Sequence, residues 1–482
     1  MMSGDEMEPA KKEGPLGDKG VTRREFMKIA GIAGATIGVG AGLGGLVAAC
    51  GGTEETTSTA GAVTTGSTTA TTSGASTTTV SAVEQGREIK LGFVTPTTGG
   101  LGVFGIADEY TVAHWKELLA GGVVCGDGKL HPINIIKVDT QSDINRASQV
   151  AGDLISNDKV DIIMAGASPD TVNPVADQAE ALGCPCLTTD CPWQPYFFGR
   201  KGDPAVGFKW TYHVQWGAGE MVAIFLDMWT KVPNNKIVGA LWPNDADGNV
   251  FRESWTPLLT DAGYTVIDGG AYQNGTEDYG SIITKFKKEG AEILTGVPLP
   301  TDFANFWAQA AQQSYKPTIA TVGKALLVAD AVEALGPTAG IGLTSELWWH
   351  PTFPFKSSFN GETCQQVADD FEAKTGHQWI MPLLHNILFE MAVDTLKRTK
   401  NVDDKNDVVS QASTIKIDSL GGPLDFSAAV GTPFRPVPNV VVNPLSGGQW
   451  EKGDKYMYQI KVVSNVSGPM IPIQQEMKPL PL

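Results

Sequence analysis

From residue 88 onward, short apolar runs alternate with longer segments whose apolar residues recur at helical spacing. In the segment 144–156, for example, Ala147, Val150 and Leu154 fall on one helical face. The first series predicts strands at 89–94, 133–138, 160–165 and 186–189, and helices at 108–119, 144–156 and 172–182. Strict alternation of strand and helix is typical of a parallel sheet covered by helices.

The same alternation resumes after residue 210. It predicts strands at 236–242, 264–267, 293–297, 318–322 and 343–347, and helices at 250–261, 279–288 and 303–313. A long helix at 381–398 and a proline-containing stretch of extended strands and turns follow. Two such series favour an α/β protein with two doubly wound parallel-sheet lobes.

The N-terminal region indicates where the protein works. A twin-arginine export pattern includes Arg23 and Arg24, and an uncharged stretch follows it up to Cys50. Small residues directly before a cysteine are typical of a lipoprotein cleavage site, after which the cysteine carries a lipid that binds a membrane. The alternative is a membrane-spanning helix over 29–49, which is just long enough but rich in glycine. We expect residues 1–49 to be a removed signal peptide and the protein to be anchored at the outer face of the cytoplasmic membrane.

The stretch 53–79 consists almost wholly of threonine, serine, alanine and glycine. A segment with so little apolar surface cannot offset the chain entropy that folding would remove. We therefore expect residues 50–86 to form a flexible, lipid-anchored tether.

The chain has a formal net charge of −17. The basic and acidic residues before Cys50 cancel, so the mature chain keeps this charge. An acidic protein is a poor partner for nucleic acid, because phosphate binding needs a basic surface. The residues left after the tether, roughly 395, are too many for one ordinary hydrophobic core and fit two lobes.

Cysteine use bounds the covalent chemistry. Once Cys50 is assigned to the lipid, five cysteines remain: Cys125, Cys184, Cys186, Cys191 and Cys364. So few cysteines do not make a disulfide scaffold, and their odd number leaves at least one thiol free or paired elsewhere. Cys184 and Cys186 flank a proline, but no second cysteine pair or nearby histidine supports a zinc site. We expect burial of these thiols, no metal site and no cofactor, and the pairing of any disulfide stays open.

Several short motifs occur in the order of a known family. They lie at 90–99, 139–143, 173–177, 275–279 and 421–426. Through these motifs the stretch 88–458 resembles the solute-binding lipoproteins of branched-chain amino-acid-type ABC importers, which have the type I periplasmic binding fold. The resemblance implies two lobes joined by three crossings, closure over a ligand, and delivery to a membrane permease with its ATPase. It also implies a monomer that binds a small solute and catalyses no reaction.

The resemblance places lobe 1 at 87–211 and 344–420, and lobe 2 at 212–343 and 421–482. In an open parallel sheet, ligands bind at the carboxyl ends of the strands. Two lobes bring two such edges face to face, so the loops that follow the strands are the candidate site. Trp348 follows the strand 343–347 and is interpreted as a packing residue, and the alternative is that it faces the ligand.

On lobe 1 the loops supply six candidate ligand contacts: Phe104, Ala167, Ser168, Thr189, Asp190 and Trp193. Phe104 matches a position where relatives often have a stacking ring, and its alternative is a core residue at a helix entry. Ser168 matches a serine that binds ligand carboxylate in relatives together with backbone N–H groups, and its alternative is a helix cap. Asp190 and Trp193 depart from the small residues that relatives have at these positions.

On lobe 2 the candidates are Tyr212, Asp247, Leu299 and Lys324. Asp245 and Asp247 lack the later glutamate of a calcium loop and favour a helix cap. Lys324 stands near the position of an acidic residue that pairs with the ligand ammonium in amino-acid-binding relatives. No carboxylate lies near Lys324 in the sequence, and an unpaired ammonium in a closed cleft is costly. This favours a carboxylate ligand with an apolar or aromatic body, and the alternative is a Lys324 that points to solvent.

The leading hypothesis is an extracytoplasmic solute-binding protein of an ABC importer. One alternative ligand is a branched-chain or other amino acid, or an amide. The alternative from another class is a secreted α/β hydrolase. The sequence contains neither a Gly-x-Ser-x-Gly elbow nor a His-Glu-x-x-His pair, and its histidines are scattered, which disfavours the hydrolase.

Overall fold

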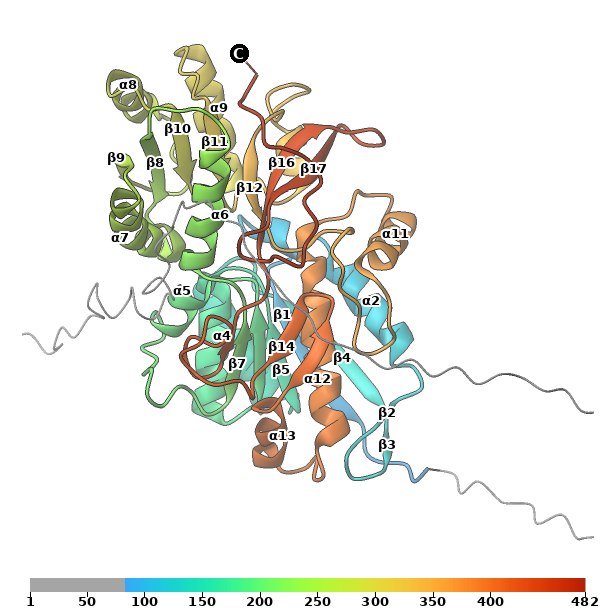
Figure 1. Ribbon diagram of the computed structural model, residues 1–482. Coiled ribbons are helices and arrows are strands. Elements are labelled where there is room, and N and C mark those ends of the chain that lie inside the picture. The colour runs from blue at the N-terminus through green and yellow to red at the C-terminus, as the bar shows by residue number, and fades with distance from the viewer. Residues whose placement is uncertain (1–82, 482) are drawn as a thin grey trace, which may run out of the picture. The chain divides into compact units, whose positions relative to one another are not determined.

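The computed structural model describes residues 83–481. The export signal predicted at Arg23 and Arg24 and the lipid site predicted at Cys50 lie outside the described residues. Two sheets organise the described chain, and each has its own helices, as Figure 1 shows. The predicted α/β class with two parallel-rich lobes is confirmed.

Six strands form the sheet of lobe 1, in the order β15-β7-β6-β5-β1-β4. Their bounds are Ile89–Thr95 (β1), Ile133–Asp139 (β4), Ile162–Ala165 (β5), Cys186–Thr189 (β6), Thr211–Val214 (β7) and Val440–Val441 (β15). Every neighbouring pair is parallel. Helices cover both faces, so strand β1 is apolar on both sides, with Phe93 buried on one face and Val94 on the other.

The sheet of lobe 2 has the order β17-β16-β12-β11-β10-β8-β9. Its strands are Ile237–Pro243 (β8), Thr265–Tyr272 (β9), Ile293–Gly296 (β10), Ile319–Val322 (β11), Thr344–Leu347 (β12), Ser446–Lys452 (β16) and Tyr458–Ser464 (β17). The strands from β9 to β12 are parallel, whereas β16 and β17 add an antiparallel edge. The predicted strand 264–267 is therefore longer than expected, because β9 pairs with β8 along most of its length.

The helices of lobe 1 pack on both faces of its sheet. They are Asp108–Leu118 (α2), Ile144–Ser156 (α3), Pro169–Leu182 (α4), Trp193–Phe197 (α5), Cys364–Thr375 (α11), Asn386–Arg398 (α12) and Lys405–Ala412 (α13), with 3-10 turns at Gly102–Gly105 (η1) and Met381–His385 (η2). Gly92 faces Leu154 of α3, while the next residue, Phe93, contacts Phe389 of α12. Since neighbouring residues of a strand point to opposite faces, α3 and α12 lie on opposite sides of the sheet.

The helices of lobe 2 are Ala218–Thr230 (α6), Ala246–Asp261 (α7), Gly280–Lys288 (α8), Pro300–Gln312 (α9) and Ala329–Glu333 (α10). Two hairpins complete the chain, Val123–Val124 (β2) with Leu130–His131 (β3), and Lys416–Ser419 (β13) with Gly422–Asp425 (β14). The sequence pattern did not indicate α6. Its residues are buried on most sides, so the helix lacks the polar stripe that makes a surface helix recognisable.

The predicted helix at 381–398 is divided. Its first residues form η2, which has Pro382 in its opening turn, and α12 continues from Asn386. Most of α12 is buried, including the polar Glu390 and Thr395. The helix therefore runs through the interior of lobe 1 rather than along its surface.

Strand pairing corrects the predicted lobe boundaries. β7 and β15 pair with each other in the first sheet, whereas β12 belongs to the second. The three crossings therefore follow Val214, Leu347 and Val441, later than the predicted changes after residues 211, 343 and 420. A sequence pattern can indicate that a segment is a strand. It does not indicate which strand pairs with it, and that partner determines the sheet to which the segment belongs.

The predicted tether also ends earlier than expected. Leu130 donates a backbone hydrogen bond to Glu84, and Gly86 donates one to Leu130, at 2.8 and 2.9 Å. Residues 84–86 therefore already pair with lobe 1, although the tether was predicted to extend through residue 86.

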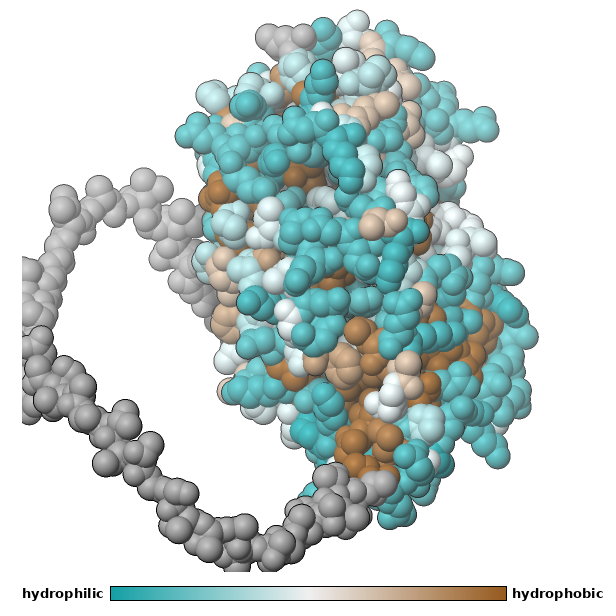
Figure 2. Space-filling model, turned by 90° about the vertical axis from the view of Figure 1, so that its right-hand side faces the viewer, coloured by the Kyte–Doolittle hydropathy of each residue, from teal (hydrophilic) through white to brown (hydrophobic). Residues whose placement is uncertain are grey.

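Figure 2 shows a mostly hydrophilic face, with hydrophobic side chains gathered in its lower part. The hydrophilic majority agrees with the net charge of −17. Within residues 83–481, the helices are too short or too polar to cross a membrane.

Truncating the ring of Phe389 should destabilise the protein. Phe389 is fully buried, stacks on Trp115 with ring centroids 5.4 Å apart, and meets the edge of Phe93 at 5.6 Å. Phe389→Ala should lower the free energy of unfolding by about 3–5 kcal/mol, because it removes apolar contacts and leaves a cavity. Urea denaturation measures the change. Val206→Ala, at a side chain that is 75 % exposed, is the control and should stay within about 0.5 kcal/mol. A loss below about 1 kcal/mol for Phe389→Ala would contradict the packing described here.

Candidate functional site

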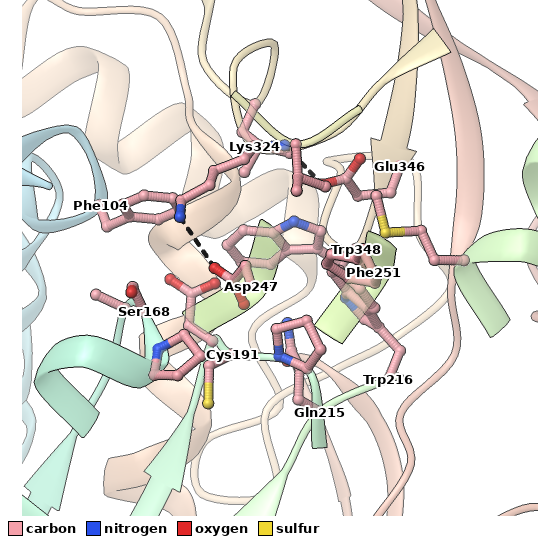
Figure 3. A pocket seen from close by; sticks show the side chains of 17 residues that line it. Phe104, Ser168, Cys191, Gln215, Trp216, Asp247, Phe251, Lys324, Glu346 and Trp348 are labelled. Atoms are coloured by element: carbon pink, nitrogen blue, oxygen red, sulfur yellow. Dashed lines mark hydrogen bonds and ion pairs between the residues drawn. The ribbon is translucent and has the colours of Figure 1, made fainter. Parts of the chain in front are cut away.

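A cavity of about 40 Å³ lies between the lobes, where the strands of both sheets end. Figure 3 shows the side chains that surround it. Lobe 1 and the first crossing contribute Phe104, Ala167, Ser168, Pro169, Asp190, Cys191, Pro192, Gln215 and Trp216; lobe 2 and the second crossing contribute Met221, Asp247, Phe251, Val297, Lys324, Leu327, Glu346 and Trp348. The carboxyl ends of parallel strands are the usual place for a ligand in open α/β sheets.

Most sequence-predicted site residues meet at this cavity. Phe104, Ala167, Ser168, Asp190, Asp247 and Lys324 line it. The cavity brings residues from four strand-end loops and one helix start into a single wall. Their contact with a ligand stays a prediction.

Four predicted residues lie outside the wall: Thr189, Trp193, Tyr212 and Leu299. The Thr189 hydroxyl donates a hydrogen bond to the backbone oxygen of Val214 at 2.7 Å, so this side chain links the ends of β6 and β7. The ring of Trp193 lies 5.9 Å from Phe198, and the ring of Tyr212 meets Phe426 at 5.4 Å. Leu299 precedes α9 and lies near Gly100 rather than in the cavity.

The crossings supply wall residues that the sequence interpretation missed. Gln215 and Trp216 directly follow β7, and Trp348 directly follows β12. Trp348 is buried and also lines the cavity, whereas its neighbour Trp349 packs against Trp379. The position of Gln215, Trp216 and Trp348 directly after the ends of strands was the only sequence feature that could have indicated them as wall residues.

Backbone strain marks three wall positions. Ala167, Asp190 and Lys324 have φ angles of 104°, 62° and 63°. Non-glycine residues rarely adopt positive φ, and such strain concentrates at functional sites. Each of the three follows the end of a strand, where the left-handed conformation turns the loop toward the cavity.

On lobe 2, two aspartates hold Lys324. The Lys324 Nζ lies 3.0 Å from Asp247 Oδ2 and 3.2 Å from Asp245 Oδ2, and its side chain is only 7 % exposed. The prediction that Lys324 lacks a nearby carboxylate is therefore wrong, as is the alternative that it points to solvent. The aspartates follow β8, which lies two places from β11 in the sheet, and sequence distance hides this proximity.

Asp245 also begins α7. Its Oδ1 accepts a hydrogen bond from the backbone N–H of Gly248 at 2.8 Å, so the predicted helix cap is confirmed at this residue. The pKa of Asp245 is lowered because the charge of Lys324 and these hydrogen bonds outweigh burial. Burial dominates at Asp247 instead and raises its pKa to about 6, although Lys324 opposes the shift.

On lobe 1, a buried hydrogen-bonded chain reaches the cavity. Asp190 Oδ2 lies 3.1 Å from His385 Nε2, and His385 Nδ1 lies 2.7 Å from Asp108 Oδ1. The hydroxyl of Thr95 donates to the other oxygen of Asp108. All of these side chains are buried, so the chain fixes the carboxylate of Asp190 at the cavity wall.

His385 is charged in this arrangement. Burial alone would lower its pKa, but Asp108 and Asp190 outweigh burial and raise the pKa to about 10. Burial raises the pKa of Asp190 to about 6, against the opposing effect of His385. His385 could not be recognised from the sequence, because its carboxylate partners lie far away in the chain.

Glu346 of β12 holds the loop of Lys324 through a hydrogen bond to its backbone. Its Oε1 accepts the backbone N–H of Lys324 at 3.0 Å, and its Oε2 accepts the Ser345 hydroxyl at 2.8 Å. Burial raises the pKa of Glu346 to about 7. The backbone that presents Lys324 thus depends on a carboxyl group that titrates near neutral pH.

Four buried polar atoms of the wall have no hydrogen-bond partner within the described residues. They are Gln215 Nε2, Trp216 Nε1, Trp348 Nε1 and Asp247 Oδ1. Buried polar atoms are almost always paired in folded proteins. Three donors and one acceptor of the wall are therefore left unsatisfied by the described residues.

Helix α4 is less suited to bind a carboxylate than predicted. Ser168 caps α4, and its Oγ accepts the backbone N–H of Asp170 at 3.2 Å. Pro169 has no N–H, and the N–H groups of Thr171 and Val172 bond to the Ser168 carbonyl. The helix-cap alternative for Ser168 is thus observed. Across the described chain, side chains of the metal-binding types do not gather in a set of three or more that could hold a metal ion.

A profile of the periplasmic binding protein family matches residues 88–449. Among solved structures, an isoleucine-bound LivJ from Streptococcus pneumoniae is 16 % identical, covers 78 % of this chain and 99 % of its own, and has a TM-score of 0.63. A leucine-binding LivK from Thermotoga maritima is 15 % identical over 78 % of this chain and 99 % of its own, with a TM-score of 0.61. A solute-binding protein from Rhodopseudomonas palustris in complex with 3,4-dihydroxybenzoic acid is 17 % identical over 79 % and 99 %, with a TM-score of 0.63. At these identities the structures show a shared fold.

The titration of Glu346 should make stability depend on pH. Burial raises its pKa from 4.5 to about 7, so between these values the native state holds a proton that the unfolded state releases. Stability from this group is therefore present below pH 4.5 and is lost as the pH rises through about 7. Glu346→Gln should remove up to about 3 kcal/mol of this fall, measured by urea denaturation at several pH values.

Glu109→Gln, at a side chain that is 76 % exposed, is the control and should keep the wild-type slope. An unchanged slope in Glu346→Gln would contradict the buried, protonated state of this carboxyl.

Proposed function

The chain belongs to the periplasmic binding protein family, and from this premise we propose that it captures a small organic solute outside the cytoplasm and delivers it to the permease of an ABC importer. The observation that carries the proposal is the cavity between the lobes, whose wall holds three unpaired donors and one unpaired acceptor. Closure of two lobes buries a ligand, and its release requires the lobes to open. A wall to which both lobes contribute polar groups suits this cycle.

The wall also defines the body of the solute. Its apolar part consists of Phe104, Met221, Phe251, Val297 and Leu327, with the indoles of Trp216 and Trp348. The free space that these side chains enclose is small, about 40 Å³, and its lining is mainly apolar, which suits a solute with a compact apolar or aromatic body. Isoleucine in the Streptococcus protein and 3,4-dihydroxybenzoic acid in the Rhodopseudomonas protein are solutes of this size class.

Lys324 no longer indicates the charge of the ligand. The carboxylate was predicted from an unpaired Lys324, and Lys324 has two aspartate partners. An amino acid or amide, the alternative ligand, would use both the donors of the wall and the free oxygen of Asp247.

A hydrolase is the weaker candidate. Both ring nitrogens of His385 bond to carboxylates, so this histidine cannot accept a proton from a nucleophile. Burial raises the pKa of the Cys191 thiol far above its ordinary value, which keeps the thiol protonated and unreactive. We therefore expect binding without turnover.

Export and anchoring complete the proposal. Arg23 and Arg24 would direct export by the twin-arginine route, and lipid on Cys50 would anchor a monomer to the outer face of the cytoplasmic membrane. The threonine- and serine-rich tether would keep the lobes near the permease and its ATPase, which raises their effective concentration there.

Trp348 and Trp349 provide a matched test of solute binding. Both indole N–H groups are buried without a partner in the described residues, but only Trp348 lines the cavity. Trp348→Phe should weaken binding roughly threefold to tenfold, because it removes one hydrogen bond to the solute. Trp349→Phe should stay within about twofold.

Calorimetry with the solute released from the purified protein measures both affinities, and chromatography of the incubated solute tests for turnover. Conversion of the solute would overturn the binding function. An equal loss of affinity in both variants would contradict a direct contact between Trp348 and the solute.

The anchor is tested by metabolic labelling with palmitate. Cys50→Ala should lose the label and leave the membrane fraction, whereas Cys364→Ala, at a buried thiol, should keep the label. Arg23→Lys combined with Arg24→Lys should retain the protein in the cytoplasm. A Cys50→Ala protein that remains labelled would contradict the lipid site.

A further inference from the structure

Resting on the proposed solute-binding function, we propose that the cleft selects a small organic cation whose charged nitrogen lies against the free carboxylate oxygen of Asp247. Three features of the cavity support this ligand class: the balance of charge around it, the unpaired atoms of its wall, and its aromatic lining. Such a ligand carries a net positive charge, in contrast to a zwitterionic amino acid or a carboxylate.

The cluster on lobe 2 carries more negative than positive charge. One ammonium, Lys324, contacts two carboxylates, Asp245 and Asp247. The Asp245 oxygens also accept hydrogen bonds from Gly248 and Asn274, so both oxygens of this carboxylate have partners. Asp247 has one oxygen on Lys324, and its Oδ1 is buried with no partner in the described residues.

The cluster on lobe 1 has the same imbalance. One imidazolium, His385, lies between two carboxylates, Asp108 and Asp190. Asp190 lines the cavity and is 6 % exposed. Each cluster therefore leaves a surplus negative charge, and the two surpluses face the same space.

The remaining titratable groups near the cavity do not reverse this balance. The carboxyls are Asp108, Asp170, Asp190, Asp245, Asp247 and Glu346, and the bases are Lys324 and His385. The thiol of Cys191 also lines the wall and is protonated. Even with Glu346 neutral, the carboxylates outnumber the bases.

The surplus decides which ligand charge the closed cleft favours. Burying an uncompensated charge is costly, and the cost falls when an opposite charge comes within contact distance. A carboxylate ligand would add a further negative charge, and the ammonium of Lys324 already has two partners. A zwitterion would leave the surplus unchanged, whereas a cation would reduce it.

The aromatic lining suits a cation as well. Phe104, Phe251, Trp216 and Trp348 surround the same space as Asp247, as Figure 3 shows. Aromatic faces attract cations, most strongly in desolvated sites. The unpaired N–H groups of Trp216, Trp348 and Gln215 would then bind a neutral acceptor, such as a hydroxyl or carbonyl oxygen, elsewhere on the solute.

The same charges couple the ligand to closure. Asp190 belongs to lobe 1 and Asp247 to lobe 2, and closure brings both to one cavity. Without a cation their repulsion opposes closure, and with a cation between them the closed form gains stability. A ligand shifts such an equilibrium only by binding the two forms unequally, and a cation meets this condition here.

The test uses two matched series on the purified full chain in detergent, measured by calorimetry. One series is phenethylamine, phenylalanine, 3-phenylpropanoate and 2-phenylethanol; the other is isopentylamine, leucine, 4-methylpentanoate and 3-methyl-1-butanol. The amine should bind at least about tenfold more tightly than the zwitterion and at least about a hundredfold more tightly than the carboxylate. A carboxylate or zwitterion that binds as tightly as its amine would overturn the proposal.

Asp247→Asn tests the assigned carboxylate. It should weaken amine binding at least about tenfold and narrow the gap between amine and carboxylate, because it removes one negative charge with little change in shape. Glu390→Gln is the control, since Glu390 is buried in lobe 1 away from the cavity and should leave the preference unchanged. An unchanged preference in Asp247→Asn would overturn the role of Asp247.

Mass spectrometry of the solute released from the wild-type protein separates this proposal from the function on which it rests. A released molecule with a basic nitrogen and no acidic group supports the cation. A released acid or amino acid would overturn the proposal that the solute is a cation, but it would support the solute-binding function. If no solute is released and neither series binds, the solute-binding function fails and the cation with it.

Discussion

The parallel strands of two sheets end at one shared cavity, and this is the constraint on which the rest of the site depends. Strand order sets which loops meet there: β5 and β6 bring Ser168 and Asp190, while β11 brings Lys324 beside the aspartates after β8. Because the strands are parallel, their carboxyl ends collect at one edge of each sheet. Strained loop residues then turn the wall toward the space between the lobes.

The balance of buried charges also shapes the site. Each lobe carries a buried base held between two carboxylates, His385 on one side and Lys324 on the other. These triads fix the wall geometry, since a buried charge that loses its partners is strongly destabilised. They also leave the cavity acidic, so a helix cap at Ser168 and a paired Lys324 replace the carboxylate-binding features that relatives suggested.

Much of the fold could be predicted because the pattern of apolar residues reports local structure. The helix at Ile144–Ser156 and the strand at Cys186–Thr189 have the predicted bounds, since a buried stripe and a short apolar run are local signals. Helix α6 was missed because burial on most sides removes its stripe. The residues 212–214 of β7 were placed in lobe 2 because the partner strand β15 lies far along the chain. Strand-end logic placed Phe104, Ser168, Asp190 and Lys324 in the loops that line the cavity. It could not indicate Trp348 or Gln215, since a side chain in a crossing can face either the core or the cleft.

The sequence by itself determined the alternation of strands and helices, the two-lobed class, and the loops in which a site could form. Those properties depend on neighbours in the chain, which periodicity and turn residues reveal. Only the tertiary structure decided what each loop residue touches. Lys324 meets Asp247 and His385 meets Asp190 across long stretches of sequence, and such contacts follow from strand order and lobe closure. The charge of the site is therefore a property of the folded arrangement, because it depends on which distant side chains share one buried space.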